Sequence, residues 1–370
     1  MHFSTSGVGI FCAVWAQGQL ASAVATQSYI PFKLINSSTI AEITSQPGNL
    51  DGPKLKPGVN ETSFDWWYFD VVSTTSKNES LTIVFYNSGP SSLGNPGGPL
   101  SIQVTGVFAN GTAFGTIADA TGGATMKNDE DGISSVWNGA GASFTGTSLE
   151  QRGVEYTVTI DNPTIGINGT LTLKSVSLPH YPCDLNKPGV SQQIIPDVFW
   201  SNAVPDAVAT ADFAIAGSPL RFTGNGYHDK NWAATIFSDT FDTWYWGHAR
   251  LGPYSLVWFD VVTKDGKEHF SSWITKDGEL FAQSCQPKSV VVRPWGQNSE
   301  FPPTPKMPAP SGYMIRYDLG GGKSFVANFT SESIQLSTNT YKRMTGPIVG
   351  GVEGHEQYSG RSLCEQFQYQ

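Results

Sequence analysis

Charged residues are scarce in this sequence, where Asp, Glu, Lys and Arg together make up 14% of 370 residues. Runs of Lys or Arg are absent, and the formal net charge is −9. Nucleic-acid binding and attraction to anionic membranes both require clustered basic residues, so this composition argues against both. No apolar stretch is long enough to span a bilayer.

Common catalytic motifs are also missing. The sequence contains no G-x-S-x-G, no H-E-x-x-H and no G-x-G-x-x-G, and its cysteines have no C-x-x-C or zinc-like spacing. The segment "LGGGKS" at 319–324 imitates a phosphate-binding loop, but Tyr317 stands where the first glycine of that motif would be. We therefore expect no metal and no cofactor, and any catalysis must come from a shaped pocket.

Cysteine is limited to Cys12, Cys183, Cys285 and Cys364. A mostly apolar stretch over 7–20, followed by small residues at 21–25, predicts a signal peptide over 1–25. This n-region lacks Lys and Arg, and a disordered tail is the alternative. Cleavage would leave three cysteines and at most one intramolecular disulfide. Sequence does not fix the pairing, but we prefer Cys285 with Cys364, because that bond would hold the C-terminal tail.

Glycosylation sequons support secretion. Such sequons are found in surface loops of secreted proteins. With the predicted leader, they indicate a glycoprotein of the secretory pathway or the extracellular space. The six asparagines are Asn36, Asn60, Asn78, Asn110, Asn168 and Asn328.

Amphipathic helical periodicity is nearly absent, and short aromatic or β-branched runs alternate with turn residues instead. "FANGTAFG" at 108–115 places Asn-Gly between two apolar runs, which is a strong hairpin signal. Strands at this spacing are typical of sandwiches and barrels. The sequence therefore predicts an all-β protein with two β-barrel or β-sandwich domains and few short helices.

The domain boundaries follow from composition. A Ser-, Pro- and Asn-rich segment over 26–60 is interpreted as an N-terminal arm. The N-terminal β-domain is expected over 61–205 and the C-terminal β-domain over 206–370. The Pro-containing stretch 178–206 would join them.

Aromatic and polar side chains concentrate between 224 and 273, where five of the eleven tryptophans fall. A single strand tryptophan usually belongs to the core. Polar groups that share strand faces with several tryptophans instead favour a pocket for an apolar ligand. For the two histidines of this set, a core role is the alternative. The predicted lining residues here are Tyr227, His228, Trp232, Trp244, Trp246, His248 and Trp258.

Two residues in this region suit acid–base chemistry. Asp260, beside Trp258, would have its pKa raised by desolvation and act as a proton donor. Lys230 would stabilise a developing oxyanion or act as a base. In "SFDWWYFDVV" at 63–72, neither face is polar, so we expect this strand to separate a core from the ligand chamber, with Asp65 and Trp67 facing the chamber.

Four segments resemble the AttH/CrtC-like superfamily, which includes carotenoid 1,2-hydratases and lipocalin-like fungal Diels–Alderases. They are "DWWYFD" at 65–70, "GNGYHDKNW" at 224–232, "WYWGHARL" at 244–251 and "VWFDVVTKDG" at 257–266. The resemblance implies two lipocalin-like β-domains, a ligand pocket in or between them, and no metal or organic cofactor.

The hydratases in this group use a His, a Trp two positions later, and a Tyr-x-Asp pair. Those positions hold Lys230, Trp232, Trp258 and Asp260 here. Because the His and the Tyr are replaced, the resemblance favours the pericyclases over olefin hydration.

We expect a pericyclase of fungal secondary metabolism that binds an apolar, terpenoid-like or polyene substrate. The expected reaction is a Diels–Alder or hetero-Diels–Alder cycloaddition of a polyene or quinone methide, with or without prior dehydration. The alternatives are a terpenoid hydratase, dehydratase or isomerase with Asp260 as acid, a non-enzymatic carrier of apolar ligands, and a glycan-binding protein or glycosidase. The oligomeric state is left open.

Overall fold

The computed structural model describes residues 26–46, 49–94, 97–129, 131–150 and 153–369. The predicted signal peptide lies outside these residues. Within them, almost all regular structure is antiparallel β-sheet, and the helices are limited to α1 (Pro90–Leu93) and the 3₁₀ turn η1 (Phe237–Asp239). The all-β prediction with few short helices is confirmed. No helix in the described part of the chain is long and apolar enough to cross a membrane.

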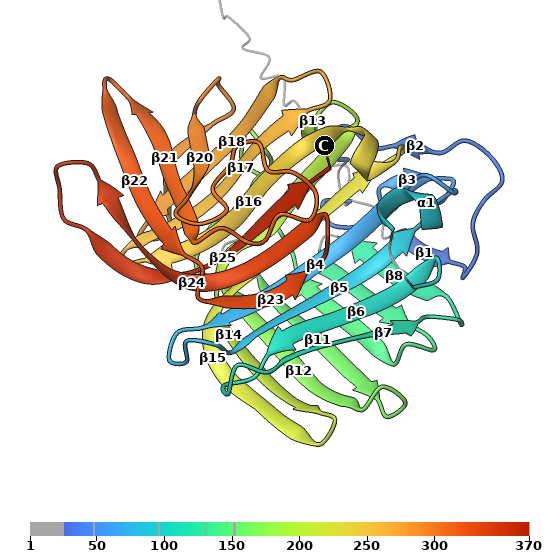
Figure 1. Cartoon of the computed structure of the whole chain (residues 1–370). Coiled ribbons are helices and arrows are strands. Elements are labelled where there is room, and N and C mark those ends of the chain that lie inside the picture. The colour runs from blue at the N-terminus through green and yellow to red at the C-terminus, as the bar shows by residue number, and fades with distance from the viewer. Residues whose placement is uncertain (1–25, 47–48, 95–96, 130, 151–152, 370) are drawn as a thin grey trace, which may run out of the picture.

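The first of two large sheets is built by the N-terminal two thirds of the chain (Figure 1). Its order is β1-β8-β9-β10-β11-β12-β14-β15-β4-β5-β6-β7, and β13 pairs with β14. The strands are β1 (Thr26–Ile30), β4 (Phe64–Ser73), β5 (Ser80–Ser88), β6 (Leu100–Val107), β7 (Ala113–Asp119), β8 (Ala124–Asp129), β9 (Gly132–Trp137), β10 (Ala142–Thr147), β11 (Glu155–Asn162), β12 (Ile167–Ser175), β13 (Gln193–Ile195), β14 (Val198–Ile215) and β15 (Ser218–Ala233).

The second sheet, coloured from yellow at β16 to red at β25 in Figure 1, lies against the first. Its order is β19-β18-β17-β16-β25-β24-β22-β21-β20, and β23 pairs with β24. The strands are β16 (Phe241–Leu251), β17 (Tyr254–Thr263), β18 (Glu268–Lys276), β19 (Glu279–Ser284), β20 (Val290–Trp295), β21 (Gly312–Gly320), β22 (Lys323–Thr330), β23 (Ser333–Ser337), β24 (Tyr341–Val352) and β25 (Tyr358–Gln368).

Each sheet curls around its own hydrophobic core, and a third apolar cluster joins the two sheets. Trp67 and Phe69 belong to the core of the first sheet, whereas Trp258 belongs to that of the second. Tyr68 and Trp246 belong to the cluster between the sheets. Because successive strand residues point to opposite faces, a strand such as β4 contributes to two apolar environments and has no polar face.

The chain changes sheets later than predicted. β14 and β15 belong to the first sheet, so the predicted boundary at 205/206 falls inside β14, and the change comes between Ala233 and Phe241. Pro205 is tolerated within β14 because the pairing with β15 is irregular between Val204 and Ala207, and proline within sheets is found at such bulges.

The N-terminal arm is an ordered part of the first domain. β1 pairs with β8, and β2 (Ile40–Ala41) pairs with β3 (Leu55–Lys56). Asp51 and Lys54 of this arm are almost fully buried. Asp51 accepts a hydrogen bond from Tyr156 Oη at 2.6 Å and contacts His228 Nε2 at 3.1 Å. The arm therefore closes one part of the first sheet's interior.

The sequons remain predictions. All six asparagines are exposed or half-buried in the structure.

The predicted disulfide is wrong. Cys183 pairs with Cys285, and Cys364 is a buried free thiol. The Cys364 side chain is packed in the core of the second sheet, whereas Cys285 is half-buried beside Cys183. The observed bond joins the loop after β12 to the end of β19, and so links the two domains.

We expect the Cys183–Cys285 bond to stabilise the fold, because it closes a loop of 102 residues. A disulfide typically contributes about 2–4 kcal/mol, and long loops lie at the upper end of this range or above it. Replacing both cysteines with serine should lower the free energy of unfolding in urea by this amount. The control, Cys364→Ala, should leave the bond intact, and non-reducing peptide mapping that joined Cys285 to Cys364 would contradict the assignment.

Candidate functional site

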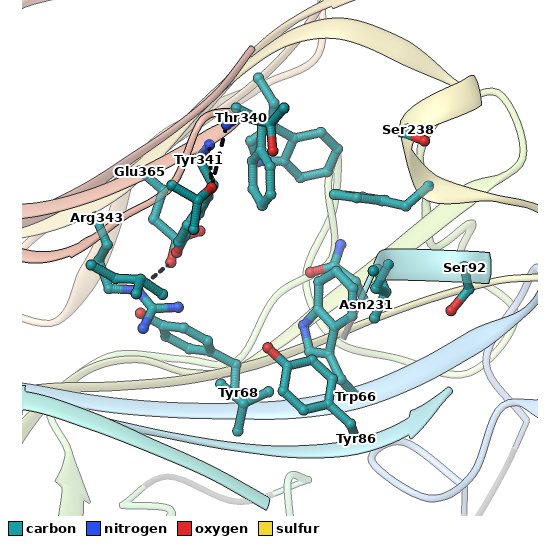
Figure 2. Close-up of a pocket in the computed structure, with 18 of the residues that line it drawn as sticks. Trp66, Tyr68, Tyr86, Ser92, Asn231, Ser238, Thr340, Tyr341, Arg343 and Glu365 are labelled. Atoms are coloured by element: carbon teal, nitrogen blue, oxygen red, sulfur yellow. Dashed lines mark hydrogen bonds and ion pairs between the residues drawn. The ribbon is translucent and has the colours of Figure 1, made fainter. Parts of the chain in front are cut away.

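A cavity of about 650 Å³ lies between the two sheets (Figure 2). Strands β4, β5, β6 and β15 form its wall on the first sheet, and β16, β17, β24 and β25 form its wall on the second. The helix α1, the turn η1 and the β23–β24 connection complete the lining. Its size matches pockets that enclose a drug-sized molecule.

Aromatic rings form a large part of the cavity wall. The ring of Trp246 lies 5.4 Å from that of Tyr68, and Trp244 lies 5.0 Å from Phe259, both pairs edge to face. Such rings bind flat apolar molecules, and their faces attract positive charge. The aromatic lining residues are Trp66, Tyr68, Tyr86, Phe237, Trp244, Trp246, Phe259, Tyr341, Phe367 and Tyr369.

Asp229 on β15 is an acidic group in this lining and is only 4% exposed. Its Oδ2 accepts hydrogen bonds from Trp200 Nε1 at 2.7 Å and from Tyr227 Oη at 2.8 Å. Within the described residues, its Oδ1 has no hydrogen-bond donor. The carboxyl is thus held rigidly by one oxygen and has the other available to a ligand.

Burial raises the pKa of Asp229 well above its usual range, and the nearby carboxylates Glu365 and Asp70 act in the same direction. The hydrogen bonds from Trp200 and Tyr227 favour the ionised form but do not offset this effect. The raised pKa favours the protonated carboxyl, which is the form that a general acid needs.

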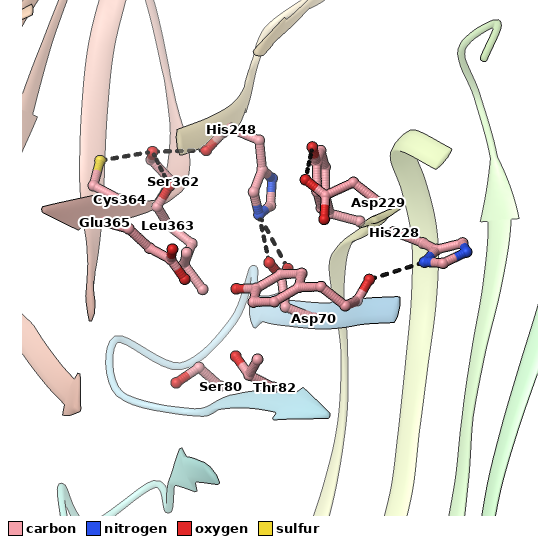
Figure 3. A network of polar contacts seen from close by, with 12 residues as sticks. Asp70, Ser80, Thr82, His228, Asp229, His248, Ser362, Leu363, Cys364 and Glu365 are labelled. Carbon is pink, nitrogen blue, oxygen red and sulfur yellow. Dashed lines mark hydrogen bonds and ion pairs between the residues drawn. The ribbon is translucent and has the colours of Figure 1, made fainter. Parts of the chain in front are cut away.

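A buried network supports Asp229 from behind the cavity (Figure 3). The Tyr227 ring stacks on His248 with centroids 4.6 Å apart. His248 Nε2 lies 3.0 Å from both carboxylate oxygens of Asp70. Since His248 is on β16 and Asp70 on β4, this pair bridges the sheets and fixes the position of Tyr227.

A buried ion pair provides further polar groups in the wall. Arg343 Nε on β24 donates to Glu365 Oε1 on β25 at 2.8 Å. The Tyr68 hydroxyl and the Trp246 indole N–H, also in the lining, have no hydrogen-bond partner among the described residues. Buried polar groups without partners are uncommon and point to an absent ligand or water.

Removing the Tyr227 hydroxyl should shift the pH dependence of any reaction in which Asp229 donates a proton. In Tyr227→Phe, Asp229 loses a donor that stabilises its ionised form, so its pKa should rise further. The alkaline limb of the kcat profile should move to higher pH, because the acid stays protonated longer. A profile with an unchanged or lowered alkaline limb would contradict this role. Circular dichroism should confirm that the variant is folded.

Of the predicted binding residues, Trp244 and Trp246 line the cavity. Tyr227 and His248 lie directly behind its wall in the Asp229 network. The remaining predicted site residues do not line it. They are Asp65, Trp67, His228, Lys230, Trp232, Trp258 and Asp260.

Lys230 lies in the interior of the first sheet. Its Nζ contacts Asp65 Oδ1 at 2.8 Å, donates to the Gly52 carbonyl at 2.7 Å, and lies 4.0 Å from the Trp67 ring centre. The Trp232 indole N–H donates to the Glu42 carbonyl at 2.7 Å. These groups hold the N-terminal arm onto the sheet.

Asp260 lies in the second domain, on the face of β17 opposite Phe259. Its Oδ2 accepts hydrogen bonds from the Val292 N–H and Arg293 Nη1, both at 2.8 Å. Burial raises the pKa of Asp260 to about 7, as predicted in direction. However, the carboxyl points toward β20, and Trp258 packs in the core of the second sheet.

Five of the cavity residues that were not predicted lie one position from a predicted residue. Trp66, Tyr68, Asp229, Asn231 and Phe259 line the cavity, and each neighbours a predicted residue in the same strand. The prediction therefore selected these strand segments, but Trp67, Lys230 and Asp260 lie on the strand faces that point away from this cavity. Nothing in the sequence marked Arg343 and Glu365 as buried site residues, because isolated charged residues in a strand usually face solvent.

Comparison with known proteins agrees with this architecture. Residues 24–293 match the family model described as Diels-Alderase-like. A crystal structure of CghA with Sch210972 superposes with a TM-score of 0.74 at 16% identity, covering 93% of this chain and 98% of that one. At this identity the likeness concerns the fold alone.

Two relatives are much closer in sequence. The quinolone epoxide rearrangement protein penF of Penicillium thymicola is 52% identical over 343 residues, which are 92% of this chain and 95% of the relative. The quinolone epoxide rearrangement protein asqO of Emericella nidulans is 50% identical over 364 residues, or 98% of each chain. The resemblance inferred from sequence is confirmed, and the chain belongs to the Diels-Alderase-like family.

Proposed function

We propose that this protein is a cyclase-type enzyme of fungal secondary metabolism that rearranges an epoxide carried by a quinolone, using the cavity between its sheets. The observation that carries the proposal is Asp229, a rigidly held carboxyl in an aromatic cavity with a pKa raised by burial. The substrate class is suggested by the names of the two relatives at 52% and 50% identity.

The chemistry needs one proton and no oxidant or reductant. Asp229 donates its proton to the epoxide oxygen as one C–O bond breaks, and a positive charge develops on the released carbon. A neighbouring group migrates to that carbon, or a new ring closes on it. The rearranged cation then loses a proton to the Asp229 carboxylate, either from the hydroxyl formed on ring opening or from the group that closed the new ring. Asp229 is thereby reprotonated, and the product is an isomer of the substrate.

The surrounding rings suit the charged intermediate. A cation against a desolvated aromatic face gains about 2 kcal/mol or more, and general acid catalysis by a positioned carboxyl contributes roughly 10²–10⁴-fold. A substrate packed against these rings would displace water from the cavity, and this water would otherwise convert the cation into a diol.

A Diels–Alder or hetero-Diels–Alder cycloaddition is the second candidate. It is favoured by the match to the Diels-Alderase-like model and by the ring-lined cavity, in which Asp229 would polarise a carbonyl of the dienophile. This reaction needs a diene and an alkene in the substrate, whereas the rearrangement needs only the epoxide.

Turnover of a quinolone with an epoxide side chain tests the proposal. The protein should consume the epoxide and form an isomer of unchanged mass, with no oxygen incorporated from H₂¹⁸O. Asp212→Asn, at an exposed carboxylate on β14, should behave like the unchanged protein. Incorporation of ¹⁸O would indicate hydrolysis. If the protein left the epoxide unchanged but converted a diene substrate, the cycloaddition would be favoured.

A further inference from the structure

We propose that Arg343 and Glu365 bind the edge of a secondary lactam, recognising its carbonyl and its N–H together. This inference rests on the proposed function, because it identifies which part of a quinolone the cavity recognises. It makes these two residues determinants of specificity, distinct from the acid Asp229.

The pair is buried and held from several sides. Arg343 and Glu365 are directly opposite each other on β24 and β25, and they are 3% and 8% exposed. Arg343 Nη1 donates to Thr105 Oγ1 at 3.1 Å and lies 3.3 Å from Gln335 Oε1. The guanidinium also lies 5.2 Å from the centre of the Tyr68 ring. The pair therefore has a fixed orientation before any ligand binds.

These contacts leave one donor and one acceptor unused. The hydrogen bonds of the described residues do not use Arg343 Nη2 or Glu365 Oε2, and both side chains line the cavity. The Tyr341 hydroxyl, also without a hydrogen bond in that part of the chain, has a pKa raised by burial and lies close enough to Glu365 for the carboxylate to raise that pKa further. The nearby Tyr68 hydroxyl is likewise unpaired within that part of the chain. A buried charged group with unused hydrogen-bonding capacity destabilises the fold unless a ligand supplies the missing hydrogen bonds.

A secondary lactam matches this arrangement. Its carbonyl oxygen and N–H lie on the same edge of the ring, so the carbonyl can accept from the guanidinium while the N–H donates to the carboxylate. An anionic ligand would be repelled by Glu365, and a simple hydrocarbon would leave both groups unpaired. An N-alkylated lactam would lose the bond to Glu365 and place a methyl group against its oxygen.

The pair and the acid belong to one site. Figure 2 shows Arg343, Glu365 and Tyr68 on one side of the hollow, with Asn231 and Ser92 across it. Glu365 contributes to the raised pKa of Asp229, so the two carboxyl groups are within electrostatic reach. A lactam held by the pair would leave its substituent free to extend toward Asp229.

Binding of two small probes tests the inference without turnover. The protein is titrated with 1H-quinolin-2-one and with N-methylquinolin-2-one, and tryptophan fluorescence is followed. Hydrogen bonds to charged groups contribute about 1.5–3 kcal/mol, so the N-methyl compound should bind about tenfold or more weakly. Equal affinities, or no binding of either probe, would overturn the proposal.

A variant pair localises the effect. Glu365→Gln should reduce the discrimination between the probes, because the amide is a weaker acceptor than the carboxylate. The matched control is Glu332→Gln, whose carboxylate pairs with Arg361 at 2.8 Å outside the cavity lining, and it should discriminate as before. If Glu365→Gln does not fold, the comparison of the two probes on the unchanged protein still tests the lactam site.

Failure of this inference and failure of the proposed function are distinguishable. Epoxide turnover without discrimination between the probes would overturn only the lactam site. Discrimination between the probes without epoxide turnover would overturn only the rearrangement.

Discussion

Replacing Asp229 by asparagine is expected to lower kcat for epoxide rearrangement by about 10²–10⁴-fold, the usual contribution of a positioned general acid. The amide keeps the size of the carboxyl and can still accept the hydrogen bonds from Trp200 and Tyr227, but it has no acidic proton. Substrate binding should change little, so KM should remain close to that of the unchanged protein. An Asp229→Asn variant with undiminished kcat would exclude Asp229 as the acid.

The same substitution should change the pH dependence of stability. The pKa of Asp229 is higher in the folded protein than in the unfolded chain, so the folded state keeps a proton that the unfolded state loses. This contribution to stability is present at low pH and is lost as pH rises from about 4 toward the folded pKa. Asparagine does not titrate, so Asp229→Asn should gain stability over the unchanged protein as pH rises from 5 to 8, measured as Tm.

Replacing Lys230 by methionine is expected to destabilise the fold by about 3–5 kcal/mol, the usual cost of breaking a buried ion pair. The change leaves the carboxylate of Asp65 buried without its cation and removes the bond to Gly52 that holds the N-terminal arm. Urea unfolding measures the loss. The double variant Asp65→Asn with Lys230→Met should recover part of it, because no unpaired charge remains.

Activity separates this structural role from the catalytic role predicted from sequence. Lys230 lies on the face of β15 opposite Asp229 and Asn231, away from the cavity. The kcat of Lys230→Met, normalised to the folded fraction, should therefore remain within a few-fold of the unchanged value. A loss of 100-fold or more in a stably folded variant would restore Lys230 as a catalytic residue.

The fold could be predicted from sequence because its signals are local. Aromatic and β-branched runs separated by Asn-Gly and Asp-Gly turns specify antiparallel strands wherever they occur. The position at which the chain passes from the first sheet to the second was harder to predict, because Pro205 and the proline-rich stretch before it resemble a linker. In the structure, a local irregularity in β14 accommodates Pro205 within the strand.

On β4, β15 and β17, the cavity residues could be predicted only to within one position. Alternation divides a strand into two faces, and polarity normally tells which face is buried. In β4, Trp67 faces a core and Trp66 faces the cavity, and both environments are apolar. The same ambiguity separates Lys230 from Asp229 and Asp260 from Phe259. Nothing in the local pattern resolves it, because the difference arises when the second sheet covers the first.

Arg343 and Glu365 depend entirely on tertiary structure. They are 22 residues apart in sequence and are brought together by the pairing of β24 with β25. Their burial depends on contact with the first sheet through Thr105. The disulfide pairing was hard to predict for the same reason, because it depends on which cysteine packs into a core, and here Cys364 does.

A crystal structure with 1H-quinolin-2-one or the rearranged product bound would test the central claim most directly. We predict that the ligand lies between the two sheets, with its lactam edge within hydrogen-bond distance of Arg343 Nη2 and Glu365 Oε2. In the product complex, the oxygen that came from the epoxide should face Asp229. A ligand bound inside the first sheet against Lys230 and Asp65, or in the second domain against Asp260, would contradict the account.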